Sequence, residues 1–178
     1  VLAEGGNAVD ACIAAAFAGE GQLDLQPLAR RLVAEGKLAE RFDPGFLTEQ
    51  LIEKQIACAL PVVHKGSRVL GFALWDGKSR LVPGAFGILQ PEVNAQTVWV
   101  EPDIVLVPLV LADRTGRRIG HGKGHYDRAL AHLRESGSPV FTIGLGWEVQ
   151  IEDEPLPSES WDVPLDAIAT PKEWIDCS

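Results

Sequence analysis

The sequence predicts a single α/β domain in which helices flank a mostly parallel central sheet. Apolar runs of strand length alternate with amphipathic helical segments along the 178 residues, which is the pattern of α/β proteins. One run, DIVLVPLVLA at 103–112, is apolar at nearly every position, so it predicts a strand buried on both faces, as in a parallel sheet. The length suits one domain with a core of its own, so we expect residues 1–178 to form one unit.

The N-terminal part of the chain predicts helices. Asn7 can cap a helix over the alanine-rich segment 5–18, although the end of this segment could instead be a short buried strand. Asp24 can cap a second helix that Gly36 ends, because acids favour the start of a helix and glycines its end. Residues 37–55 are more polar and contain a short helical stretch.

The remaining segments predict strands and one further helix. Apolar runs with the length of buried strands stand at 56–63, 69–75, 139–146 and 166–170. After the run at 103–112, a helix is expected to begin near His125. Its apolar stripe has helical spacing and should face the sheet; it consists of Tyr126, Ala129, Leu130 and Leu133.

Composition and charge exclude several classes of function. A net charge of −9 opposes broad nucleic-acid binding, which needs a basic surface. No run approaches the roughly 20 apolar residues that span a membrane, and no basic segment precedes an apolar one as in a signal peptide. Cys12, Cys58 and Cys177 have neither metal-site nor redox spacing, which predicts inert thiols. We therefore expect a cytoplasmic protein without nucleic-acid or membrane partners.

The stretch RRIGHGKGHYDRAL at 117–130 has the composition of a phosphate-binding loop. A strand, a glycine-rich turn and a helix in that order bring backbone N–H groups and the positive end of the helix dipole together. Lys123 adds a mobile positive charge, and Arg118 can bind two phosphate oxygens at once. The glycine spacing fits neither the Walker loop nor the dinucleotide fingerprint. A glycine-rich turn with solvated charges remains an open interpretation.

Asp127 is the acidic member of this stretch. A carboxylate beside a phosphate repels it unless a cation lies between them, and Mg²⁺ binds one or two carboxylates together with phosphate oxygens. An acid in the first turn of a helix is also favoured by the helix dipole. The pattern therefore allows a magnesium ligand or a purely structural residue at this position.

The segment DIVLVPLVLADRTGRRIGHGKGHYDRAL resembles the signature of the 5-formyltetrahydrofolate cyclo-ligase family, also called methenyltetrahydrofolate synthetases. The likeness extends outward over about residues 16–170, interrupted by residues 37–55, which look like an insertion. It implies a single α/β domain of the NagB/RpiA/CoA-transferase type. Shorter stretches that resemble family motifs follow in the right order at 22–28, 59–63, 86–91 and 162–170.

The resemblance implies an enzyme that acts on a small folate, and we expect a monomer. It would use ATP and Mg²⁺ to convert 5-formyltetrahydrofolate to 5,10-methenyltetrahydrofolate, with release of ADP and phosphate. In the family's mechanism the formyl oxygen attacks the γ-phosphorus, N10 attacks the resulting imino-phosphate, and phosphate leaves. Phosphoryl transfer needs fixed cations and amides around the transferred group, which would account for the glycine-rich loop.

The resemblance also implies roles for single residues. Lys123 and Arg118 would be catalytic, Asp127 and Asp162 would hold Mg²⁺, and the folate would contact Gln22, Phe86 and Tyr126. The nucleotide-binding set would be Arg118, Ile119, Gly120, His121, Gly122, Lys123, Gly124, His125 and Tyr126. Other interpretations stay open: Tyr126 as a core aromatic, both histidines as exposed loop residues, and Asp162 as a turn residue.

The chain departs from the family pattern in several places. It has no equivalent of the basic N-terminal helix whose Lys and Arg contact ATP. It starts at Val1 and contains no methionine, which indicates a missing N-terminus, a non-AUG start or a fragment. Gln22 stands where the family has Glu, and His125 replaces the first Tyr of a Tyr-Tyr-Asp pattern.

These departures leave two further hypotheses. A non-catalytic nucleotide- or folate-binding relative could have kept the loop and lost the N-terminal helix. A sugar-phosphate or CoA-handling relative is also possible, but it would give Asp127 and Asp162 no metal to hold. Separately, residues 1–18 resemble a stretch near the start of γ-glutamyltranspeptidases, without the Thr-Thr-His motif of those enzymes, and we interpret them as a capped helix.

Overall fold

The structure is a computed structural model, and it describes residues 14–15, 48, 51–63, 70–84, 88–120, 122, 124–137 and 140–177. The helix predicted at 24–36 lies outside these residues. At the end of the segment 5–18, strand β1 (Ala14–Ala15) pairs antiparallel with β2. The strand alternative is therefore confirmed for these two residues, and the helix prediction is wrong there.

A four-stranded sheet forms the centre of the fold, in the order β12-β11-β9-β6. β6 (Ile104–Pro108) runs parallel to β9 (Phe141–Leu145), and β9 runs parallel to β11 (Ala167–Ala169). β12 (Trp174–Asp176) adds an antiparallel edge. The first four residues of β6 are buried, as expected of a parallel strand with both faces covered.

The apolar run at 103–112 is not one strand, and this expectation is wrong. It divides into β6 and β7 (Leu111–Asp113), which belong to different sheets. β7 pairs antiparallel with β8 (Arg118–Ile119) and parallel with β10 (Ile151–Glu152). The chain turns a corner between them, after Pro108, and its hydrogen bonds change partner: the Leu109 N–H still donates to Leu145, whereas the Val110 N–H donates to Ile119.

Gln150 satisfies the carbonyl groups at this corner. It ends the short 3₁₀ helix η2 (Glu148–Gln150). Its Nε2 donates to the carbonyl oxygens of Leu109 and Val110, at 2.7 and 3.1 Å, and its Oε1 accepts from the Trp147 N–H at 2.8 Å. Because backbone carbonyls turned away from a sheet need other donors, this one amide lets the chain leave the central sheet.

Two antiparallel hairpins complete the described sheets. β2 (Cys58–Val63) pairs with β3 (Leu70–Trp75), close to the predicted runs at 56–63 and 69–75. β4 (Leu81–Pro83) pairs with β5 (Leu89–Pro91) and was not predicted. The fold is therefore α/β with mixed sheets, and its parallel part comprises β6, β9, β11 and the pair β7–β10.

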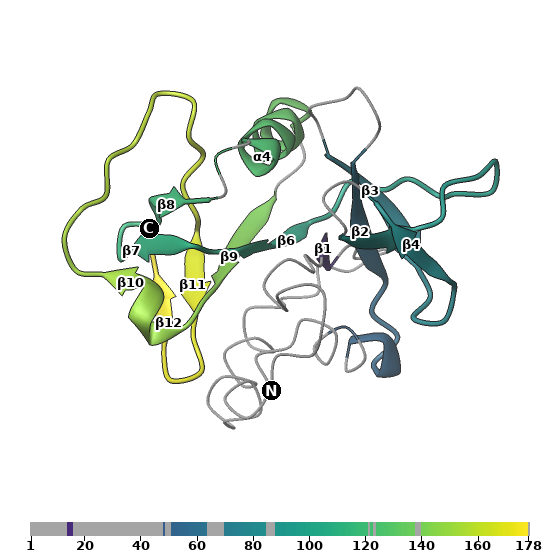
Figure 1. Ribbon diagram of the computed structural model, residues 1–178, viewed down its shortest axis with the longest axis horizontal. Coiled ribbons are helices and arrows are strands. Elements are labelled where there is room, and N and C mark those ends of the chain that lie inside the picture. The colour runs from purple at the N-terminus through teal and green to yellow at the C-terminus, as the bar shows by residue number, and fades with distance from the viewer. Residues whose placement is uncertain are drawn as a thin grey trace.

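Helix α4 (His125–Glu135) begins where the sequence predicts. It lies above β6 and β9, with β2, β3 and β4 to one side and β7, β8 and β10 to the other (Figure 1). Ala129, Leu130 and Leu133 are buried in one core cluster with Val105 and Ile168 of the sheet. The predicted stripe thus faces the sheet, and the glycine-rich stretch enters α4 at the edge of the core.

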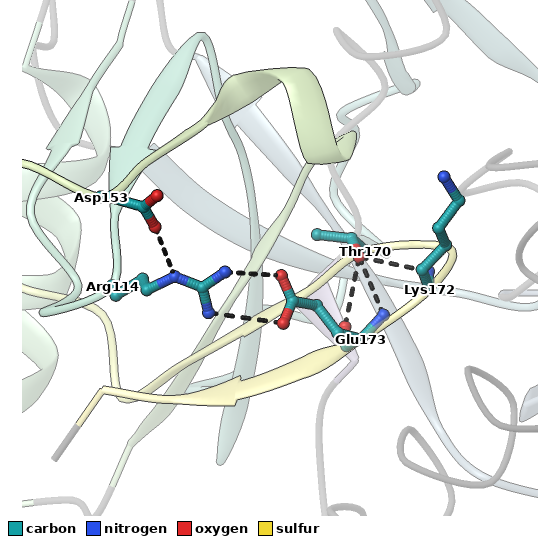
Figure 2. Close-up of polar contacts among 5 residues, drawn as sticks. All are labelled: Arg114, Asp153, Thr170, Lys172 and Glu173. Carbon is teal, nitrogen blue, oxygen red and sulfur yellow. Dashed lines mark hydrogen bonds and ion pairs between the residues drawn. The ribbon is translucent and has the colours of Figure 1, made fainter.

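Ion pairs join the far edges of the sheets. The Arg114 guanidinium contacts Asp153 at 2.9 Å and Glu173 at 3.1 Å (Figure 2). The Thr170 hydroxyl accepts hydrogen bonds from the backbone N–H groups of Lys172 and Glu173, at 3.2 and 3.0 Å, which shapes the β11–β12 turn. These contacts link the turn after β7, the segment after β10 and the turn before β12.

The described cysteines are free thiols. Cys58 is buried, and its burial raises the pKa of the thiol to about 11. A thiol with such a pKa is protonated at neutral pH and unreactive, which agrees with the predicted inert role. Among the described residues, no helix has the length and apolar character needed to cross a membrane.

Candidate functional site

A cavity of about 920 Å³ lies between the glycine-rich stretch, the first turns of α4 and the β2–β3 hairpin. One wall is apolar and comes from the hairpin and its surroundings, with Pro61, Val63, Leu70 and Ile88. Another part of the lining carries the glycines and charged groups of 118–128. A volume of this size is typical of small-molecule sites, and its two walls suit a ligand with a flat apolar part and an anionic part.

The glycines present backbone to open space. A Cβ atom built at Gly120 or Gly122 would meet no atom within 4 Å. Gly122 and Gly124 have φ angles of +74° and +59°, in the left-handed region that glycine tolerates. Gly124 is also the N-cap of α4 and offers no side chain to the first turn of the helix. A phosphate group could therefore approach this backbone closely and lie at the helix N-terminus.

Arg118 and Asp127 form an ion pair at the base of the polar wall. The Arg118 Nη2 atom lies 2.6 Å from Asp127 Oδ1, and the two side chains are only 6% and 21% exposed. The second nitrogen, Nη1, donates to the carbonyl oxygen of Val163, while the Val163 N–H donates to Asp127 Oδ1 at 3.3 Å. We call these three residues the Arg118 clamp. It ties the loop and α4 to the C-terminal segment.

Asp162 lies beside this clamp and lines the same cavity as Asp127. Its Oδ2 atom accepts the Glu159 N–H at 2.7 Å, and its own N–H donates to the Glu159 carbonyl at 3.1 Å. The fold thus brings these two acids to one cavity, although they are 35 positions apart in the sequence (162 against 127).

The two acids fit a magnesium ion bound together with phosphate oxygens. In the part of the chain that the structure describes, hydrogen bonds reach only Oδ1 of Asp127 and Oδ2 of Asp162, so each carboxylate keeps one oxygen for a cation. Those residues include no group of three or more His, Cys, Asp or Glu side chains able to hold a metal. Mg²⁺ is commonly bound by one or two carboxylates, and phosphate oxygens and water then complete its coordination shell. The two acids fit this pattern.

The other predicted site residues divide into two groups. Ile119, His125 and Tyr126 line the cavity with the glycines, and Tyr126 also packs against the core cluster, so it contacts both the cavity and the core. The remaining members lie outside the described residues: Gln22, Phe86, His121 and Lys123.

Three of the cavity residues that were not predicted as site residues carry polar or aromatic side chains. Trp161 lines the cavity and is 68% exposed. Arg128, one turn into α4, also lines it, and its Nη1 would lie 3.1 Å from a Cβ at Gly124. Gln90 completes the apolar wall, and its Oε1 accepts the Val63 N–H at 3.3 Å. The sequence signal for Trp161 was a single tryptophan within the otherwise polar segment 158–162. The signal for Arg128 was its position four residues after Gly124, on the same side of the helix.

Two other acids near the site are structural. Asp113 is buried, and its carboxylate accepts hydrogen bonds from Thr115, Arg117 and the Leu156 N–H. Burial alone would raise the pKa of Asp113, but these hydrogen bonds hold it below its ordinary value. Asp166 joins β9 to β11, because its Oδ2 accepts the N–H and hydroxyl of Thr142, each at 2.7 Å.

Comparison with known proteins agrees with this geometry. The sequence model of the 5-formyltetrahydrofolate cyclo-ligase family matches residues 45–171. The chain is 31% identical to the 5-formyltetrahydrofolate cyclo-ligase of Escherichia coli K12 over 159 residues, which cover 87% of this chain and 75% of that protein. It is 38% identical to the Haemophilus influenzae protein of the same name over 109 residues, 60% of this chain and only 57% of that protein.

Solved structures show the same relationship. The NMR structure of the Aquifex aeolicus 5,10-methenyltetrahydrofolate synthetase matches with a TM-score of 0.55 and 28% identity, over 90% of this chain and 69% of that one. The Mycoplasma pneumoniae synthetase, with a TM-score of 0.51 and 23% identity, shares the fold. These comparisons give no support to the γ-glutamyltranspeptidase resemblance of residues 1–18. The family match over more than half of the sequence shows that the chain belongs to the 5-formyltetrahydrofolate cyclo-ligase family of enzymes.

Proposed function

We propose that this chain converts 5-formyltetrahydrofolate to 5,10-methenyltetrahydrofolate, using ATP and Mg²⁺, and that it does so in the cavity of about 920 Å³. The observation that carries the proposal is the meeting, in one cavity, of an open glycine backbone, two carboxylates and an apolar wall. A sugar-phosphate or CoA-handling relative would give Asp127 and Asp162 no metal to hold, whereas a magnesium-dependent phosphoryl transfer would give them one.

The phosphates of ATP would lie on the glycine backbone. Gly120 and Gly122 present backbone to open space, with the Arg128 guanidinium beside Gly124, and the N-terminus of α4 adds its positive dipole. Lys123 would place a mobile ammonium group on the transferred phosphoryl group, with His121 and His125 close in sequence. The backbone N–H groups and the helix N-terminus are fixed in place, so they stabilise the charge of the transition state without reorganisation at the moment of reaction.

Asp127 and Asp162 would hold Mg²⁺ through Oδ2 of Asp127 and Oδ1 of Asp162, the oxygens that accept no hydrogen bond from the described residues. Bound there, the ion would neutralise charge on the phosphates. Arg118 itself was predicted to contact phosphate, but both of its terminal nitrogens are engaged, one by Asp127 and one by the Val163 carbonyl. We therefore propose that Arg118 supports catalysis chiefly by positioning Asp127 and the segment that carries Asp162.

The folate would lie toward the apolar wall. Pro61, Val63 and Ile88 offer it a surface without hydrogen-bonding side chains, and Gln22, Phe86 and Tyr126 would complete the contacts. The formyl oxygen is a poor leaving group until it carries a phosphoryl group, so the chain must hold it next to the terminal phosphate of ATP. An apolar wall that excludes water also protects a phosphorylated intermediate from hydrolysis.

The organisation of the whole chain belongs to the same proposal. We propose one cyclo-ligase domain over residues 1–178, of the NagB/RpiA/CoA-transferase type, in which residues 37–55 are an insertion. The protein would act as a cytoplasmic monomer on a small folate. Gel filtration at micromolar concentration tests the monomer, and deletion of 37–55 with retained activity would support the insertion.

One assay tests the function directly. The protein is mixed with Mg-ATP and 5-formyltetrahydrofolate, and the methenyl product is followed by its absorbance. We expect turnover in the wild type and its loss in Lys123→Ala and in Asp127→Asn, both with unchanged circular dichroism. A protein that binds ATP but never forms product would instead be the non-catalytic relative, and turnover that survives both substitutions would remove the loop from the mechanism.

A further inference from the structure

Trp161 is a large aromatic side chain at the cavity that is left mostly in solvent, with 68% of its surface exposed. Trp99 and Trp147 are exposed to smaller extents, 43% and 40%, and neither lines this cavity. An aromatic side chain can bury 150–250 Å² on contact with a partner. An indole presented to a ligand cavity in this way has a contact surface that the described part of the chain does not use.

The backbone around Trp161 is anchored on both sides. Before it, the Glu159 N–H and carbonyl are both hydrogen-bonded to Asp162, at 2.7 and 3.1 Å. After it, the Arg118 clamp holds the peptide of Val163 at both its N–H and its carbonyl oxygen. Leu165, nearly fully buried, donates its N–H to the Gly116 carbonyl at 2.9 Å. The exposure of the indole therefore does not come from a loosely held segment.

The position of the segment agrees with a role at the ligand. The long connection between β10 and β11 passes β8 and approaches α4 (Figure 1). It thereby brings Trp161 and Asp162 to the wall of the cavity that carries the glycines. Asp162 is a proposed magnesium ligand, so the phosphates of the nucleotide would lie close to it. The adjacent Trp161 indole would then lie near the ring of the nucleotide or of the substrate held beside the phosphates.

We propose that Trp161 stacks on a planar nitrogen heterocycle of the bound substrates and so determines affinity for it. The inference rests on the proposed function, which supplies two such rings: the adenine of the nucleotide and the pterin of the folate. Both are flat and present a π-face, which is the feature that an indole recognises. Stacking needs no hydrogen bond, so an exposed tryptophan suffices for it.

Equilibrium binding tests this proposal without turnover. Titration calorimetry with Mg-ADP and, separately, with 5-formyltetrahydrofolate gives the Kd of each ring-bearing ligand for wild type, Trp161→Ala, Trp161→Phe and the control Trp147→Phe. We expect Trp161→Ala to raise the Kd of one of the two ligands about tenfold, which corresponds to about 1.4 kcal/mol. Trp161→Phe should recover most of the affinity, and Trp147→Phe should bind like wild type. The ligand that responds identifies the stacked ring.

A second readout separates stacking from a structural role. The responding ligand should quench indole emission in wild type and in Trp147→Phe, and this quenching should be lost in Trp161→Phe. Kd values within twofold of wild type for both ligands in Trp161→Ala would overturn the proposal, as would an equal loss for both with a lowered urea midpoint. If the wild type forms no methenyl product but shows the Kd effect, the proposed reaction fails and the role of Trp161 stands.

Discussion

Replacing Arg118 by methionine removes the centre of the Arg118 clamp while keeping much of the apolar stem. Among the described residues, Asp127 then keeps a single hydrogen-bond donor, the Val163 N–H at 3.3 Å, and the Val163 carbonyl loses the Arg118 donor. Breaking a buried ion pair by removing one partner costs about 3–5 kcal/mol. Because the Asp127 side chain is 21% exposed and water can reach it, we expect a loss below this range, about 2–3 kcal/mol.

Urea unfolding followed by circular dichroism measures this loss. With a slope of roughly 2 kcal/mol per molar urea, a loss of about 2–3 kcal/mol lowers the midpoint by roughly 1 M or slightly more. Asp127→Asn is the complementary change, since it leaves the 6% exposed guanidinium without a charged partner. It should also lose stability, and it should lose the increase in thermal stability that Mg-ADP gives the wild type.

The double substitution Arg118→Met with Asp127→Leu is the decisive control. Because it leaves no uncompensated charge, it should be more stable than the summed losses of Arg118→Met and of the single variant Asp127→Leu predict, by at least about 1 kcal/mol. It should nevertheless be inactive, since the proposed magnesium ligand is gone. A stability change below about 0.5 kcal/mol in Arg118→Met, or strictly additive losses in the double variant, would show that the clamp does not hold the site together.

Three further changes test the fold around the site. Asp113→Asn should destabilise the protein, because an amide nitrogen would face donors such as the Leu156 N–H. Since the pKa of Asp113 is lowered in the folded state, its contribution to stability should be present above about pH 4 and lost as the pH falls through the folded value. Urea midpoints measured from pH 7 to pH 3 should show this loss for the wild type and not for the variant. Gly116→Ala should lower the thermal midpoint much more than Gly122→Ala, because both have positive φ but only at Gly116 would a Cβ meet the Leu165 carbonyl; similar midpoints would contradict this. Arg114→Ala should leave stability and turnover nearly unchanged, because its ion pairs (Figure 2) are exposed and screened by water and salt, and a large shift in midpoint would contradict that view.

Local patterns were enough to predict much of the fold. The strands near 56–63, 69–75 and 139–146 and the start of α4 follow from runs of apolar residues and from glycines, which act within a few residues. The glycine-rich stretch was recognised for the same reason, since its backbone properties depend on its own residue types. The resemblance to a family added Asp162, which no local pattern would have selected.

The features that sequence reasoning missed depend on distant partners. The run 103–112 breaks into two strands where the Gln150 side chain donates hydrogen bonds to the carbonyl groups of Leu109 and Val110. No residue near Pro108 indicates this distant partner. The engagement of Arg118 requires the peptide of Val163, far along the chain. A pattern within one segment cannot show which groups the folded chain brings to its side, so a free phosphate ligand and a clamped guanidinium look alike in sequence.

The amide of Gln150 has a consequence for which side chains can stand at that position. It gives hydrogens to two carbonyl oxygens and takes one from the Trp147 N–H. A glutamate of the same size would place a carboxylate oxygen against these two carbonyl oxygens, which would repel it. A methionine would supply no hydrogen-bond donor to them. Exchanging a single NH₂ for an oxygen, on a residue outside the cavity lining, would therefore loosen the bend that precedes the glycine-rich stretch.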